Sequence, residues 1–107
     1  MIDLTRIVGF AWDDGNARKN EKHRVSQSEA EEVFFNQPLL LLDDAQHSEQ
    51  EQRFHALGKT HESRTLHISF TLREDGTLIR VISARDMHRK ERSIYEQAKQ
   101  AAAQVRK

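Results

Sequence analysis

The segment TLHISFTLREDGTLIRVISA, residues 65–84, decides the fold. In residues 65–72 apolar side chains alternate strictly with polar ones, and this period of two is typical of a strand with one buried and one open face. Residues 73–77, REDGT, contain the Asp-Gly pair that favours a tight turn. The segment therefore predicts a β-hairpin, with residues 78–84 as the returning strand.

The segments on either side of the hairpin extend this prediction. Residues 53–59, RFHALGK, are expected to form a third strand, which the polar residues THES join to the hairpin. Three successive strands with tight turns predict an antiparallel meander. Residues 87–107 then predict a long helix, with Asp86 as its N-cap.

The N-terminal part of the chain predicts two helices between two short strands. Residues 7–12 and the leucines at 39–42 are typical of strands. A polar helix is expected over 15–24, because Asp13 or Asp14 suits its N-cap, and a second helix over 26–35, because Ser26 or Ser28 can cap it and glutamates follow. The predicted order is β-α-α-β-β-β-β-α, an α+β fold in which an antiparallel sheet meander packs against N-terminal helices and a C-terminal helix, in one domain over residues 1–107.

The composition is typical of a small folded protein with a thin core. Hydrophobic residues make up 36% and charged residues 32% of the chain, the mean hydropathy is -0.81, and the net charge is zero. The absence of cysteine excludes disulfides and thiolate metal sites and fits a reducing compartment. No apolar run approaches the roughly 18–20 residues of a membrane span, and residues 1–10 lack the features of a signal peptide. We therefore predict a cytoplasmic protein without membrane contact.

The zero net charge conceals a strong segregation. Residues 1–26 contain five Lys or Arg and four Asp or Glu, residues 27–51 contain none and seven, and residues 52–107 contain twelve and six. The net charges are therefore +1, -7 and +6, which sum to zero. Either the acidic segment folds back and neutralises the basic one, or a basic surface for a polyanion lies beside an acidic surface that faces elsewhere.

The period of two also predicts which polar side chains share the open face of the sheet. His67 opposes the apolar set of its strand, Arg80 opposes that of the returning strand, and Arg53, His55 and Lys59 share one parity on the strand before the hairpin. If the registers agree, one face gathers all of these side chains. An antiparallel sheet often has a solvated polar face without a function. Histidine and arginine together, however, are typical of phosphate binding and proton transfer.

No common catalytic motif accounts for these residues. The chain has no glycine-rich phosphate loop, HExxH, GxSxG or cysteine nucleophile, and its histidines form no i, i+4 pair on one helix, so neither a metal nor a cofactor is expected. Cleavage of RNA needs no metal, because the substrate's 2′-hydroxyl is the nucleophile and the protein supplies proton-transfer groups and cationic donors. The catalytic candidates are Arg80, Arg85, Arg53, His55 and His67.

Two pairs of residues leave alternatives open. Strict alternation puts Arg80 and Arg85 on opposite faces, so only one reaches the open face unless a bulge or the strand end redirects Arg85. Each arginine either binds phosphate or makes a surface salt bridge. Glu91 can pair with an arginine six positions earlier only across space, and Tyr95 is either a core anchor of the last helix or a platform on which a base stacks.

Positive charge gathers where the last strand meets the last helix, in residues 79–96. Cations at such a junction are expected to hold an RNA backbone without selecting sequence. Lys19 and His23 stand four residues apart on the predicted first helix, and they either flank the site or are simply solvated. A non-catalytic module that binds nucleic acid would present the same basic stripe. The predicted RNA-binding residues are Lys19, His23, Lys59, Arg89, Lys90 and Arg92.

Several short motifs occur in order along residues 10–96. They are WD at 12–13, Asn20 with KHRV at 22–25, EA at 29–30 before VF at 33–34, RF at 53–54 before LG at 57–58, and ISAR at 82–85, followed by Glu91 and Tyr95. Together they resemble the BrnT family of toxins of type II toxin-antitoxin systems. One departure is Arg24, which stands where the family usually has glycine after Lys-His and which adds a positive charge.

The resemblance implies a fold, an activity and a partner. The implied fold is similar to that of RelE, and the implied activity is metal-independent endoribonuclease action that inhibits growth by cleaving RNA. The implied partner is a cognate BrnA-like antitoxin, which binds the toxin and represses their operon through its own DNA-binding domain, so operator DNA is contacted only through the antitoxin. A tight inhibitor of such a toxin is expected to cover or neutralise its basic site.

Overall fold

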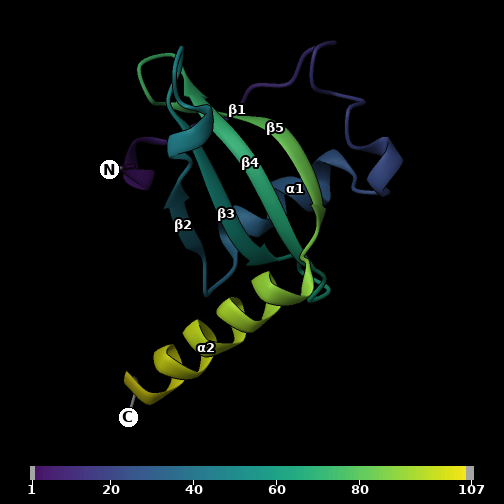
Figure 1. Cartoon of the computed structure of the whole chain (residues 1–107). Coiled ribbons are helices and arrows are strands. Elements are labelled where there is room, and N and C mark those ends of the chain that lie inside the picture. Colours follow the sequence, from purple (N-terminus) through teal and green to yellow (C-terminus); the bar gives the residue numbers. More distant parts are fainter. Residues whose placement is uncertain (1, 106–107) are drawn as a thin grey trace.

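The computed structural model describes residues 2–105, with side chains described up to residue 101. Five strands form one sheet in the order β1-β5-β4-β3-β2, and two α-helices accompany it (Figure 1). The α+β class is therefore as predicted. The strands are β1 (Gly9–Phe10), β2 (Leu40–Asp43), β3 (Arg53–Lys59), β4 (Thr65–Arg73) and β5 (Leu78–Asp86), and the helices are α1 (Gln27–Glu32) and α2 (Arg89–Val105).

Strands β3, β4 and β5 form the predicted antiparallel meander. β3 pairs with β4 from Arg53 opposite Thr71 to Lys59 opposite Thr65, and β5 pairs with the other edge of β4. Residues 74–76 of the hairpin turn all have positive φ, a conformation that suits the Asp-Gly pair at its end. The prediction from alternation and turn chemistry is confirmed here.

The first strand differs from the prediction. Only Gly9 and Phe10 pair, and they run parallel to Leu78 and Ile79 of β5. The sheet is therefore mixed and not purely antiparallel. Alternation along a sequence indicates a strand but neither its partner nor its direction. The meander leaves one edge of β5 unpaired, and the N-terminal segment occupies the beginning of that edge.

The helix predicted over residues 15–24 is wrong. Only Glu21–His23 (η2) form a single 3-10 turn. The side chains of Asp13 and Asn16 bind backbone N–H groups within this loop, at 2.8 Å in each case. Such short polar side chains compete with the helical hydrogen-bond pattern, which explains why a polar, charged segment stays a loop.

Two buried asparagines attach this loop to the sheet. Asn16 donates to the carbonyl of Val81 at 3.0 Å, and the side-chain oxygen of Asn20 accepts from the N–H of Ala84 at 2.8 Å. These groups lie on the part of the β5 edge that the two residues of β1 do not reach. The asparagines therefore satisfy backbone groups that a longer first strand would have paired.

The second predicted helix is confirmed, with its last turn tightened. Ser26 and Glu29 form a reciprocal capping box at the start of α1. The chain continues directly into a 3-10 turn, Val33–Phe35 (η3). Ala30 and Val33 are completely buried against the sheet.

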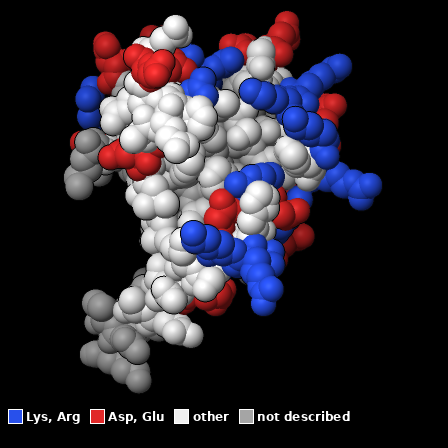
Figure 2. Space-filling model, viewed as in Figure 1, with Lys and Arg blue, Asp and Glu red and all other residues white. Residues whose placement is uncertain are grey.

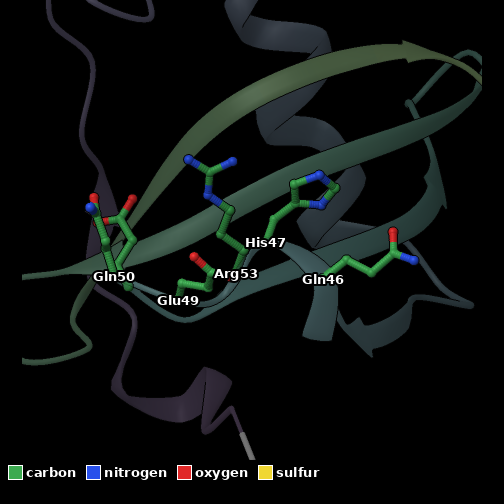
Figure 3. Close-up of a pocket in the computed structure, with 6 residues that line it drawn as sticks. Gln46, His47, Glu49, Gln50 and Arg53 are labelled. Atoms are coloured by element: carbon green, nitrogen blue, oxygen red, sulfur yellow. The ribbon is translucent and has the colours of Figure 1, made fainter.

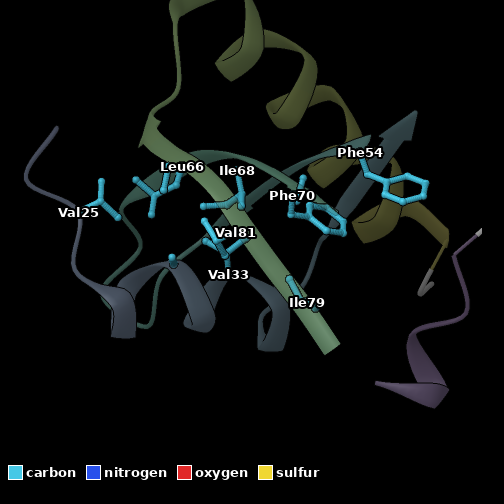
Figure 4. Packing of buried hydrophobic residues seen from close by; sticks show 11 residues of the cluster. Val25, Val33, Phe54, Leu66, Ile68, Phe70, Ile79 and Val81 are labelled. Atoms are coloured by element: carbon cyan, nitrogen blue, oxygen red, sulfur yellow. The ribbon is translucent and has the colours of Figure 1, made fainter. Parts of the chain in front are cut away.

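The hydrophobic core lies between α1, η3 and one face of the sheet (Figure 4). Phe70 is at its centre, with ring centroids 5.1 Å from Phe34 and 5.5 Å from Phe54. Figure 1 shows α1 behind the sheet, so that the opposite face is turned to the viewer. The buried core residues are Val25, Ala30, Val33, Phe54, Ala56, Leu66, Ile68, Phe70, Ile79, Val81 and Ala84.

The prediction that Asp86 caps the last helix is wrong. Asp86 is the last residue of β5, and its carboxylate accepts from Arg64 Nε at 2.8 Å. The helix begins at Arg89, and the carboxylate of Glu91 accepts from the N–H of His88 at 2.8 Å. Strand pairing with β4 continues two residues further than the apolar pattern indicated, because the polar residues at the end of β5 still have partners on β4.

Helix α2 is attached to the sheet near its first turns. Tyr95 is buried, packs with Leu57 and Met87, and donates from its hydroxyl to the carbonyl of Pro38 at 2.8 Å. The core-anchor alternative for Tyr95 is therefore correct. Figure 1 shows the remainder of α2 extending away from the sheet.

Candidate functional site

A β-bulge interrupts the alternation of β5. Ser69 of β4 pairs with Ser83, whereas the next residue, Phe70, pairs with Val81. Ile82 therefore has no partner on β4. An extra residue of this kind shifts the side-chain alternation by one position.

The bulge places two arginines on the same face. Arg80 lies opposite Thr71, and Arg85 lies opposite His67. Thr71 and His67 are four residues apart on one strand and so share a face, and paired residues point to the same side of a sheet. Of the two alternatives that strict alternation left open, the structure has the bulge.

The five predicted catalytic residues lie together on the sheet face opposite the core. They fall in three neighbouring rows across β3, β4 and β5, which follow from the pairing registers. The rows are Arg53-Thr71-Arg80, His55-Ser69-Ser83 and Leu57-His67-Arg85.

Two histidines are in contact at the centre of this face. The ring centroids of His55 and His67 are 4.6 Å apart in an edge-to-face arrangement. His67 is only 7% exposed, and its Nδ1 has no hydrogen-bond partner among the described residues. Burial, reinforced by the charge of Arg85, lowers the pKa of His67 to about 4, so this ring is neutral at pH 7.

Asp44 holds the other histidine. Its Oδ2 lies 3.0 Å from Nε2 of His55 and 2.9 Å from Nδ1 of His47. Burial opposes ionisation of Asp44, but the hydrogen bond from His47 and the charges of both histidines outweigh it and keep the pKa of Asp44 below its ordinary value. An ionised carboxylate only accepts, so Nε2 of His55 carries a hydrogen, and in the neutral ring Nδ1 keeps a free lone pair.

Glu91 reaches the same cluster from α2. Its carboxylate accepts from Nη1 and Nη2 of Arg85 at 2.8 and 2.9 Å, and Oε2 lies 3.9 Å from Nε2 of His67. The hydrogen bonds from Arg85 lower the pKa of Glu91 to about 2. The expectation that Glu91 meets an arginine across space is therefore confirmed, and Arg85 is committed to this pair.

Arg80 and Arg53 differ in whether their guanidinium groups already have partners. Arg80 donates to both carboxylate oxygens of Asp13, at 2.7 and 3.1 Å. Arg53 Nε is buried and has no partner within the part of the chain that the structure describes. Arg53 also borders an open hollow of about 490 Å³ together with residues from 46–51, and Figure 3 shows Arg53 and His47 on the same side of the strands. Arg53 therefore has a spare donor for an anion.

Helix α2 covers one end of this face. Leu40, Leu57, Met87 and Tyr95 form a small apolar cluster there. Lys59 pairs with Thr65 in the row next to Leu57 and His67, at the end of the face that this cluster occupies. The prediction of one continuous open face was therefore too broad.

The i, i+4 arrangement predicted for Lys19 and His23 on one helix is absent, because only a 3-10 turn forms over Glu21–His23. Lys19 is exposed in the loop that precedes η2, and His23 is the last residue of η2. His23 does border the site, because it lines a hollow together with Arg85.

The remaining predicted cations surround the start of α2. Arg89, Lys90 and Arg92 are exposed in its first turns, and Arg92 donates to the carbonyl of Met87 at 2.9 Å. Figure 2 shows Lys and Arg side chains gathered on the side of this face that belongs to β5 and the start of α2. They form a rim beside the histidines and not part of the cluster itself.

Sequence reasoning raised the pair of Glu91 with an arginine but missed Asp44. Asp44 and His47 belong to the segment 27–51, yet Asp44 contacts His55, and Glu51 pairs with Arg73 at 2.7 Å. The acidic segment therefore neutralises part of the basic one internally. The sequence contained a local signal for Glu91. Glu91 is the third residue of the helix that begins at Arg89, and a glutamate at this position often accepts from the N–H of the residue that precedes the helix, here His88.

Among residues 2–101, no three histidine, aspartate or glutamate side chains are grouped so that they could hold a metal ion. Within the described chain, no helix combines the length and the apolar character needed to cross a bilayer. The expectation that the protein needs no metal and no cofactor stays a prediction.

Comparison with known proteins identifies the family. No curated protein matches the chain. A family model described as "Ribonuclease toxin, BrnT, of type II toxin-antitoxin system" matches residues 12–91. The matched segment contains the bulge, the two histidines and the Arg85-Glu91 pair, and it spans well over half of the 107 residues. This chain therefore belongs to the BrnT family of ribonuclease toxins of type II toxin-antitoxin systems.

Proposed function

We propose that this protein is a metal-independent endoribonuclease toxin and that the face carrying Arg53, His55 and His67 is its active site. Membership of a ribonuclease toxin family supports RNA as the substrate. In the proposed reaction the 2′-hydroxyl of RNA attacks the adjacent phosphorus and the bond to the 5′-oxygen breaks, which leaves a 2′,3′-cyclic phosphate and a 5′-hydroxyl. The protein must move protons and stabilise the negative charge that develops on the phosphate.

His55 is the best-placed proton acceptor. Its side chain is 32% exposed, whereas His67 is buried. Because Asp44 occupies Nε2 of His55, the lone pair on Nδ1 is available to take the proton of the 2′-hydroxyl. The imidazolium that forms is then stabilised by the ionised Asp44. His67, neutral and in edge contact, is a positioning residue that holds the His55 ring without adding positive charge beside it.

Arg53 and Arg80 are suited to the phosphate. They flank Thr71 in one row, directly next to the row that contains His55. The guanidinium of Arg53, which borders the open hollow, supplies charge-assisted hydrogen bonds to a phosphate oxygen, and Arg80 adds a second guanidinium on the other side of the row. Arg85 acts differently, since its ion pair with Glu91 fixes the surroundings of His67.

The contact of two histidines beside two buried polar atoms without a partner among the described residues carries this proposal. A solvated sheet face presents its polar groups to water. Here His67 Nδ1 and Arg53 Nε are both buried and unpaired among the described residues. Such groups cost roughly 1–3 kcal/mol each in a folded protein, so a sheet face that retains two of them is typical of a catalytic site and not of a merely solvated surface.

The test is cleavage of total RNA by the purified protein in the presence of a metal chelator. We expect cleavage to persist and the products to carry 2′,3′-cyclic phosphate ends. His55→Ala and Arg53→Ala should each lower the rate by about 100-fold. The matched control is His61→Ala, because His61 is exposed in the turn between β3 and β4 and should leave the rate unchanged. Activity that disappears with the chelator and returns with a metal contradicts the metal-free mechanism.

We further infer that a BrnA-like antitoxin covers this face and that the complex contacts operator DNA only through the antitoxin. The toxin-antitoxin family supports an antitoxin partner, and an intracellular RNA substrate places the action of the toxin in the cytoplasm. The competing function is a non-catalytic nucleic-acid-binding module, which the exposed cations around α2 favour. Expression of the toxin should arrest growth, and Arg80→Ala and Arg85→Ala should restore it, whereas a simple binding module should not arrest growth at all.

A further inference from the structure

A second hollow, of about 340 Å³, lies at the end of β5, between η2 and the start of α2. It is lined by Lys22, His23 and Arg24 on one side and by Arg85, Asp86 and His88 on the other. The proposed chemistry uses only Arg85 from this set. Lys22 and Arg24 are exposed and make no ion pair with any described residue.

Arg64 fixes the backbone beside this hollow. It donates to the backbone carbonyls of Arg24 at 2.8 Å and of His23 at 3.3 Å, so the loop is fixed while its side chains stay outside. The same guanidinium binds the carboxylate of Asp86 through two hydrogen bonds, at 2.8 and 3.1 Å. Asp86 also lines the hollow, and its charge is partly compensated by Arg64, whose Nη1 also lies 3.1 Å from Oε2 of Glu29.

Arg24 occupies a backbone conformation that disfavours its side chain. Its φ is 57° and its ψ is 37°, in the left-handed region that glycine adopts most readily. A strained non-glycine residue suggests a function for its side chain, and here that side chain adds a cation to a hollow that already contains several.

We propose that this hollow binds a phosphate of the RNA chain that lies next to the scissile one, and that Arg24 and Lys22 provide its charge. The inference rests on the proposed function. Arg85 connects the two places, because it lies opposite His67 on the catalytic face and also lines the hollow. RNA that runs from the histidines past Arg85 therefore meets this second group of cations.

A polyanion fits this hollow better than a protein partner does. Interfaces between proteins have an apolar centre, whereas the lining here is almost entirely charged or imidazole, and its only apolar residue, Met87, is buried. Exposed Lys and Arg side chains on a fixed backbone are typical of phosphate contacts. An acidic segment of the antitoxin is the competing occupant, and the experiment below tests it.

The experiment compares short and long RNA with the full chain. Arg24→Gly removes the cation and also relieves the strained backbone, so its melting temperature should be unchanged or higher. Lys22→Ala is the second variant, and Lys99→Ala, exposed on α2, is the control. Binding is measured with a 2′-O-methyl RNA ten-mer, which lacks the nucleophile, over a range of salt concentrations. Cleavage is measured with RNA dinucleotides and with ten-mers.

We expect Arg24→Gly to weaken ten-mer binding by about five- to tenfold and to reduce the slope of log K against log salt by about 0.7, the value for one phosphate contact on single strands. Cleavage of dinucleotides should not change, because they do not reach the hollow. An equal loss on dinucleotides, or an unchanged salt slope, overturns the inference, and so does a variant that loses only antitoxin binding. If no RNA is cleaved at all but the salt slope falls, the proposed reaction fails and the phosphate site stands.

Discussion

Replacing Glu91 with glutamine should lower the free energy of unfolding by about 2–3 kcal/mol at pH 7. The pKa of Glu91 is about 2 in the folded protein and 4.5 ordinarily, and the dominant cause is the pair of hydrogen bonds from Arg85. At about 1.36 kcal/mol per pKa unit, this difference corresponds to about 3.4 kcal/mol. The Glu91 side chain is 22% exposed, and glutamine keeps one acceptor oxygen for Arg85, so the expected loss is smaller than the full value.

The pH dependence of the unfolding free energy tests this prediction in a second, independent way. The folded-state pKa of Glu91 is depressed, so its contribution to stability is complete above the ordinary value of 4.5 and is lost as the pH falls toward 2. Urea unfolding of both proteins between pH 7 and pH 2 should therefore show a difference in unfolding free energy that shrinks through this window. Glu96→Gln is the control, because Glu96 is exposed on the same helix, and it should change stability by less than about 0.5 kcal/mol.

Two results would refute the reasoning. A deficit for Glu91→Gln below about 0.5 kcal/mol at pH 7 would mean that the ion pair with Arg85 is no stronger than a surface pair. A deficit of the expected size that stays constant down to pH 2 would mean that it comes from packing and not from the charge of Glu91.

Three further substitutions test the packing that positions the site. Gly58→Ala should destabilise the protein by about 1–3 kcal/mol in urea unfolding, because a Cβ at this position would lie 2.7 Å from Val33 Cγ1 in the core, and an unchanged midpoint would show that η3, which carries Val33, moves freely. Tyr95→Phe should cost about 1 kcal/mol, since it removes the hydrogen bond to Pro38 and keeps the ring, and a calorimetric melting temperature checks it. Ser26→Ala removes the side-chain half of the capping box and should cost about 1 kcal/mol of unfolding free energy, whereas Ser26→Asp should restore most of it.

Much of the candidate site was predictable, because the side of a strand to which a residue points follows from its neighbours in the sequence. Alternation put Arg53 and His55 opposite the apolar residues of β3, and His67 opposite those of β4, and the register between the two strands then joined them on one face. Their contact followed from that register. Asp44 was not predictable, because a loop that is polar along the sequence carries no sign of the side chain it will meet.

The N-terminal loop shows the opposite case. Residues 15–24 have the polar and charged composition of a solvated helix, but Asn16 and Asn20 bind the exposed edge of β5. Backbone groups on that edge need partners once the sheet has formed. A helix would have left them unpaired, so the tertiary context outweighed local propensity.

The sequence by itself determined the hairpin, the meander, the capping box of α1 and the segregation of charge, because these depend on periodicity and on contacts between residues a few positions apart. Only the tertiary structure decided that β1 runs parallel to β5, that the bulge at Ile82 brings Arg80 and Arg85 to one face, and that Asp44 and Glu91 join the histidines. Each of these depends on which distant segments pair and in which register. A shift of one residue in that register moves every side chain of a strand to the other face, and no local pattern in the chain encodes it.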